Sequence, residues 1–217
     1  MVSNFDFLKK DFPVLSNFGE MAEKYCYSDS NSCLMKLGMI GETIVNLMFT
    51  YDRIAFPHDN TAAARIDTLS REGLLTSDLV TILHGLRKVR NKAVHENYAS
   101  IADDKTFLPM AHSLCEWFMQ TYGDWNYSHK DFVMPEENTV SVTVDKEAEE
   151  KKESELTKLA EQTAAAAPIV EQTERKKQAY KAANQRPKTE AETRFLIDEQ
   201  LRMVGWDADT ENLRYSK

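Results

Sequence analysis

Four cations and one histidine fall within the nine residues from Arg87 to His95, in a chain whose formal net charge is -8. A helix turns about 100° per residue, so Arg90 shares a face with the apolar residues of this segment, whereas Asn91 and His95 lie on the opposite side. A guanidinium on an apolar face keeps its charge and needs a carboxylate, a phosphate or water beside it. The segment therefore predicts an internally held arginine and an outward basic, titratable face.

One chemistry open to this segment is RNA cleavage. His95 would act as general acid or base on a 2′-hydroxyl or on the leaving oxygen, Arg90 would stabilise the charged phosphorane, and Asn91 would orient the two. One histidine and one arginine supply only half of an acid–base pair, so two copies of the segment would have to face each other in a dimer. The simpler alternative for His95 is a solvated histidine at a helix end, where the helix dipole favours it.

The other cations have simpler roles open to them. Arg87, Lys88 and Lys92 could bind nucleic-acid phosphates, although the acidic surroundings and the absence of interleaved aromatic residues disfavour this use. For Arg90 the alternative is a structural ion pair inside the protein, and Glu42 is the expected partner because it falls on a strongly apolar helix. We expect no metal ligands among these residues.

The elements that must position this segment are helices. Apolar residues recur at helical spacing throughout the first 135 residues, and the alternation of Val, Ile and Thr that is typical of strands is absent before residue 139. The fold class predicted is therefore an all-α bundle, whose second helix is apolar on nearly all sides and lies at the centre. Capping and stop signals place the helices at 3–27, with a break at Pro13, and at 32–54, 57–69, 76–97 and 103–122.

The composition changes after Pro135. Residues 136–188 are rich in Lys, Glu, Gln and Ala and hold few large aliphatic side chains, so we predict a charged linker that is partly helical or disordered and is broken at Pro168. Residues 140–144 alternate in the manner of a short extended segment. A last helix is predicted over 189–204.

Several classes of protein are excluded. Cys26, Cys33 and Cys115 lack the spacing of metal ligands, so we expect neither disulfides nor zinc, as in a reducing cytoplasm. The first residues carry no secretion signal, and polar residues interrupt the longest apolar run at 37–49, so no membrane span is expected. Nucleotide-binding and hydrolase motifs are absent, so no cofactor is expected in this chain.

The motif RNKAVH at 90–95 resembles the signature of HEPN domains, which are small helical bundles. Many of them are metal-independent ribonucleases of prokaryotic defence systems. The resemblance implies that Arg90, Asn91 and His95 would be the catalytic residues if this chain were such a ribonuclease.

The rest of the chain resembles the amino-terminal region of the restriction (R) subunit of type I restriction-modification enzymes. In that family a helical domain precedes a charged segment, a PD-(D/E)XK nuclease and an ATP-driven DNA translocase. Relatives usually carry an arginine where this chain has Gly38, so a salt bridge made there is lost or replaced. The motifs that carry the resemblance occur in the same order as in the family: SNFDFLK (3–9), KLGMIGE (36–42), RNKAVH (90–95), ETRFLID (192–198), LRMVGW (201–206) and LRYSK (213–217).

The resemblance implies an interaction and positioning region of a cytoplasmic, ATP-dependent DNA-cleaving complex that defends its host against foreign DNA. The chemistry, with ATP and magnesium, would lie beyond Lys217. The partners would be the modification and specificity subunits, with DNA bound through the full complex, and a homodimer is an open alternative. The domains implied are a HEPN-like bundle (1–135), the charged linker (136–188) and the truncated start of an α/β nuclease domain (189–217).

Overall fold

The computed structural model describes residues 2–137 and 145–206, and these residues form helices and no strand. The all-α fold predicted from the sequence is confirmed. The chain divides into two compact units, one that ends at Arg186 and one that begins at Pro187. The alternating segment 140–144 and the last motif, 213–217, lie outside the described residues.

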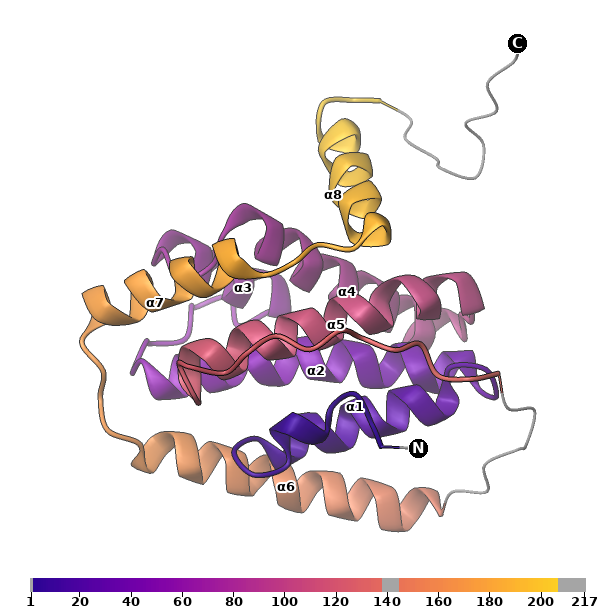
Figure 1. The fold of residues 1–217 in the computed structure, drawn as a ribbon, viewed down its shortest axis with the longest axis horizontal. Helices are drawn as coiled ribbons and strands as arrows, with labels where there is room; N and C mark the ends of the chain where they lie inside the picture. The colour runs from indigo at the N-terminus through magenta and orange to yellow at the C-terminus, as the bar shows by residue number, and fades with distance from the viewer. Residues whose placement is uncertain (1, 138–144, 207–217) are drawn as a thin grey trace. The chain divides into compact units, whose positions relative to one another are not determined.

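The core of the first unit is a helical bundle with α2 at its centre. This helix packs against α1, α4 and α5, and α3 covers α4 (Figure 1). A short 3-10 helix, η1, precedes the bundle. The bounds are η1 Asp6–Leu8, α1 Pro13–Tyr25, α2 Ser30–Tyr51, α3 Ala62–Arg71, α4 Ser77–Glu96 and α5 Ile101–Tyr122.

The helix boundaries follow local capping chemistry. Pro13 is the first residue of α1, where its fixed φ favours the helix and its missing N–H costs nothing. Asn97 ends α4 in the left-handed conformation at φ 49°. The third helix begins at Ala62 and not at 57 as predicted, because Thr61 caps it by accepting a hydrogen bond from the Ala64 N–H at 3.2 Å.

By length and composition, α2 is the one helix among the described residues that could cross a membrane. Of its most apolar window, 72% is buried inside the protein. The core helix of a bundle meets the same criteria, because neighbouring helices cover it on several sides.

Two further helices, α6 (Lys146–Ala166) and α7 (Gln172–Gln185), follow the bundle and are separated near Pro168, as predicted. The predicted charged linker, partly helical or disordered, did not anticipate their packing on the bundle. Helix α6 lies along α1 and α2, and α7 lies along α5 (Figure 1). The first compact unit therefore ends at Arg186 and not near residue 135.

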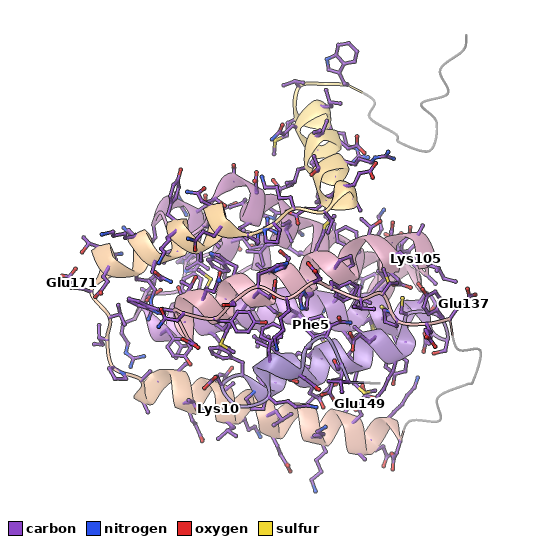
Figure 2. All side chains as sticks on the ribbon, in the orientation of Figure 1. Phe5, Lys10, Lys105, Glu137, Glu149 and Glu171 are labelled. Atoms are coloured by element: carbon purple, nitrogen blue, oxygen red, sulfur yellow. The ribbon has the colours of Figure 1, made fainter. Side chains whose placement is uncertain are left out.

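Buried charges dock α6. The Lys36 Nζ of α2 lies 2.6 Å from both Glu149 Oε1 and Glu153 Oε1, and all three side chains are nearly buried. Tyr25 donates a hydrogen bond of 2.9 Å to Glu149 Oε2, and Glu149 points from α6 toward the bundle (Figure 2). Each ion removed from water has an opposite charge beside it, which is the condition for burying it.

A second buried pair docks α7. Arg175 Nε lies 3.1 Å from Asp52 Oδ1, with the two side chains 4% and 6% exposed. The guanidinium lies 4.3 Å from the centre of the Tyr122 ring, whose hydroxyl donates a 2.6 Å hydrogen bond to Asp52 Oδ2. Trp117, fully buried on α5, donates to the Ala179 carbonyl at 3.0 Å.

The second unit contains α8 (Glu190–Met203), close to the predicted range of 189–204. Thr189 caps it by accepting a 3.1 Å hydrogen bond from the Glu192 N–H. An ion pair joins Arg194 and Glu190 at 2.7 Å along the helix.

His112 is a buried histidine in the first unit, enclosed by the rings of Phe5 and Phe7 at centroid distances of 5.5 Å. Burial, followed by the charge of His129, lowers the pKa of His112 to about 4. In the unfolded chain its pKa is about 6.5. The unfolded state therefore takes up this proton first, and stability is lost as the pH falls from about 6.5 to about 4.

Replacing His112 by leucine is expected to remove this loss. At pH 4 the destabilisation that His112 causes amounts to at most about 3 kcal/mol. Urea midpoints measured between pH 7.5 and 4 should fall less steeply in His112→Leu than in the natural chain. Exposed His58, changed to leucine, is the control and should leave the slope unchanged. Parallel profiles for His112→Leu and the natural chain would contradict the assignment.

Candidate functional site

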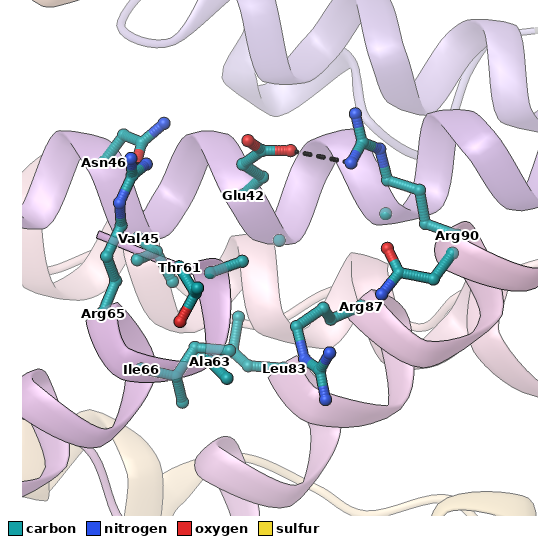
Figure 3. Close-up of a pocket in the computed structure, with 14 residues that line it drawn as sticks. Glu42, Val45, Asn46, Thr61, Ala63, Arg65, Ile66, Leu83, Arg87 and Arg90 are labelled. Atoms are coloured by element: carbon teal, nitrogen blue, oxygen red, sulfur yellow. Dashed lines mark hydrogen bonds and ion pairs between the residues drawn. The ribbon is translucent and has the colours of Figure 1, made fainter. Parts of the chain in front are cut away.

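A cavity of about 380 Å³ opens between α2, α3 and α4, on the helix that carries the basic segment (Figure 3). Leu83, Arg87, Arg90 and Asn91 contribute to it from α4. The other two helices supply the remaining walls: Gly38, Gly41, Glu42, Val45 and Asn46 from α2, and Thr61, Ala62, Ala63, Arg65 and Ile66 at the start of α3. The cavity thus brings together three parts of the chain that are distant in sequence.

Arg90 faces α2. Its Nη1 lies 3.1 Å from Glu42 Oε2, the carboxylate that the sequence suggested as its partner (Figure 3). The stem of Arg90 crosses Gly38, where a built Cβ would overlap the Arg90 Cβ and lie 2.7 Å from Cγ. No side chain fits at position 38 beside this arginine, which is a physical reason for glycine there.

The Arg90–Glu42 pair is not buried as the sequence led us to expect. The two side chains are 35% and 39% exposed, so water screens their attraction. A pair of this kind contributes about 1 kcal/mol or less, well below the cost of breaking a buried pair. Arg90 lies at the edge of the apolar face because Gly38 lets its stem pass outward.

Arg87 and Arg65 bring further positive charge to the cavity. Arg65 donates to Asn60 Oδ1 at 2.8 Å and to Asn46 Oδ1 at 2.6 Å, so both of these acceptors are neutral amides. The Nε of Arg87 is shielded from solvent and has no hydrogen-bond acceptor in the described part of the chain. A buried donor without an acceptor is uncommon and requires an explanation.

The remaining residues of the segment lie outside this arrangement. His95 and Lys88 are exposed and do not line the cavity. Lys92 is exposed, and its Nζ lies 5.3 Å from the centre of the Tyr98 ring. His95 follows Arg90 by five residues, so it projects roughly 140° away around the helix. The structure therefore separates the two residues that RNA cleavage would require and brings Arg90 together with Arg87 and Asn91 instead.

In the described ranges, 2–137 and 145–206, no group of three or more His, Cys, Asp or Glu side chains could hold a metal ion. The three cysteines are buried and free. Burial raises the pKa of the Cys115 thiol well above its usual range, which keeps it protonated and unreactive.

Sequence reasoning missed the wall that α3 contributes. Thr61 and Arg65 carried no recognisable motif, and only the folding of α3 onto α4 brings them to the basic segment. The sequence did hold a signal for the close approach of α4. Gly38 and Gly41 lie three residues apart on α2, and a Cβ at these positions would meet Arg90 and Leu86 of α4.

Residues 20–162 match the family model described as "Domain of unknown function (DUF4145)". The match extends past residue 135 into α6, in agreement with the packing of that helix on the bundle.

Among curated proteins, the chain is similar to the type I restriction enzyme EcoKI endonuclease subunit of Escherichia coli (strain K12). The two are 26% identical over an alignment of 270 residues, which covers 99% of this chain. The chain spans 23% of the length of that relative. No solved structure matches the chain.

Proposed function

We propose, from the premise that this chain belongs to the family described as domain of unknown function DUF4145, that it is an interaction and positioning region of a type I restriction endonuclease subunit. The observation that carries the proposal is the similarity to the EcoKI endonuclease subunit along 99% of the chain. ATP-dependent DNA cleavage, with its ATP and magnesium, would belong to the rest of such a subunit.

The geometry supports a positioning role in two ways. Buried ion pairs hold α6 and α7 on the bundle, so residues up to Arg186 form one unit that can present a fixed surface to partners. The acid–base candidate His95 projects away from Arg90, so a single chain lacks an assembled catalytic pair. The partners proposed are the modification and specificity subunits, in the cytoplasm, with DNA reached through them.

The alternative is a HEPN-type ribonuclease that uses Arg90, Asn91 and His95 in a homodimer. The observation that favours it is the exposure of Asn91 and His95 on α4, where a second copy could meet them. It requires the basic segments of two chains to face each other.

One experiment separates the two functions. The chain is co-expressed with the modification and specificity subunits of a type I system from the same genome and is passed over a sizing column. We expect it to co-elute with them. The chain alone, incubated with single-stranded RNA and a metal chelator, should leave the RNA intact, and His95→Ala should behave like the natural chain.

The control variant is His58→Ala, which changes an exposed histidine outside the basic segment. RNA cleavage that is lost in His95→Ala and kept in His58→Ala would establish the ribonuclease instead. Separate elution of the chain and the other subunits would contradict the positioning role.

A further inference from the structure

We propose that the cavity between α2, α3 and α4 binds a small phosphorylated molecule, whose phosphate is held by Arg87, with Arg65 adding positive charge to the cavity wall. The inference goes beyond the proposed function, because a positioning region needs no ligand of its own. It rests on the charge, the unmet donors and the size of the cavity.

The cavity holds more positive than negative charge. Its lining includes Arg65, Arg87 and Arg90 but only one carboxylate, Glu42, which is paired with Arg90. Neither Arg65 nor Arg87 has a carboxylate partner within the described residues. In a chain of net charge -8, two guanidiniums left without carboxylates around one cavity form a local site for an anion.

Some hydrogen-bond donors of this cavity are already held in position or unpaired before a ligand binds. Asn60 and Asn46 fix the Arg65 guanidinium through two hydrogen bonds, so little side-chain freedom is lost when a ligand binds. The shielded Nε of Arg87 has no acceptor in the described chain, and a ligand oxygen would supply one. A buried donor without an acceptor costs free energy, so a ligand oxygen that accepts from the Arg87 Nε would add to the free energy of binding.

The start of α3 adds two more donors. Thr61, Ala62 and Ala63 line the cavity, and the Thr61 hydroxyl already accepts from the Ala64 N–H. The N–H groups of Ala62 and Ala63 lie in the first turn of the helix, where no carbonyl one turn earlier can accept a hydrogen bond from them. They can therefore donate to a ligand. The first turn of this ten-residue helix also carries the positive end of its dipole, which favours an anion beside the arginines.

Size and shape select the class of ligand. A volume of about 380 Å³ lies within the range typical of small-molecule sites. Val45, Ile66 and Leu83 give apolar walls for the body of a ligand. A tetrahedral phosphate can accept from donors on α3 and α4 together, whereas a carboxylate presents two oxygens in one plane. We therefore infer a phosphomonoester on a body up to the size of a nucleoside.

The probe is adenosine 5′-monophosphate, titrated into the full chain by calorimetry at low salt, with adenosine and inorganic phosphate as partial ligands. We expect the nucleotide to bind at least about tenfold more tightly than adenosine, because the charge-assisted hydrogen bonds come from the phosphate. Inorganic phosphate should bind more weakly than the nucleotide, because it makes no apolar contacts.

Two variants with the same change of charge test whether Arg87 contributes to nucleotide binding. Arg87→Gln should weaken nucleotide binding by about tenfold or more. Arg71→Gln, on α3 but outside the cavity lining, should bind like the natural chain. Arg87 makes no hydrogen bond or ion pair within the described residues, so its replacement should leave the urea midpoint nearly unchanged and the folded variant can be titrated.

A second readout locates the ligand. The chain has seven glycines, and two of them, Gly38 and Gly41, line the cavity. With ¹⁵N-labelled glycine, the amide signals of these two should shift on titration with the nucleotide, whereas those of Gly19 and Gly123 should not. These measurements use the chain alone, so their failure is distinct from a failure to co-elute with other subunits.

Three results would overturn the inference: neither the nucleotide nor inorganic phosphate shifts Gly38 and Gly41, adenosine binds as tightly as the nucleotide, or Arg87→Gln and Arg71→Gln bind the nucleotide equally.

Discussion

Replacing Arg175 by methionine is expected to lower the free energy of unfolding by about 3–5 kcal/mol, because it leaves the Asp52 carboxylate buried without its cation. Within the described residues, the Asp52 carboxylate then keeps the hydroxyl of Tyr122 as its one side-chain donor. The same change removes the guanidinium from the Tyr122 ring and from the Thr121 carbonyl. Urea unfolding monitored by circular dichroism at pH 7 measures the effect.

Lys177→Met is the matched control for this prediction, since Lys177 is exposed on the same helix, and it should change stability by less than about 0.5 kcal/mol. The double variant Asp52→Asn, Arg175→Met removes both charges and should be more stable than Arg175→Met alone. A loss below about 1 kcal/mol for Arg175→Met would mean that this pair does not dock α7.

Replacing Gly38 by alanine is expected to lower stability by about 1–3 kcal/mol, although alanine is intrinsically the better helix former. The new methyl group would overlap the Arg90 Cβ, close to the backbone of α4, where rotating the side chain cannot relieve the clash. Helices α2 and α4 would have to separate, and the Arg90–Glu42 pair would be displaced. The midpoint of urea unfolding measures this change.

Gly41→Ala provides the contrast three residues further along α2. A Cβ at Gly41 meets Leu86 Cδ1 at 3.4 Å, an ordinary contact. The usual gain of about 0.5–1 kcal/mol from replacing a helical glycine should therefore survive. If Gly38→Ala were as stable as Gly41→Ala, the close approach of Arg90 to α2 would be disproved.

Most of the helices could be predicted, because their signals are local. Capping residues, a proline at the start of α1 and apolar residues at helical spacing act within one or two turns. The range expected for α4, 76–97, agrees with the observed Ser77–Glu96 within a residue at each end. The start of α3 was predicted five residues early, since the sequence does not reveal which of several polar residues caps the helix.

The packing of the charged segment after residue 135 could not be predicted from the local sequence. Its composition predicts solvated helices, and α6 and α7 are indeed rich in charge. Their docking depends on partners far away in the sequence, such as Lys36 for Glu153 and Asp52 for Arg175. Composition gives no sign that such charges will be buried.

By itself, the sequence determined the all-α class, the place of α2 at the centre, the basic segment of α4 and the partner expected for Arg90. Only the tertiary structure decided that the Arg90 and Glu42 side chains are each more than a third exposed and that Arg65 joins Arg87 at one cavity. Helix formation depends on neighbours within about four residues, whereas burial and the meeting of distant charges depend on how helices pack. The contact between the Arg90 side chain and Gly38 is one that depends on helix packing.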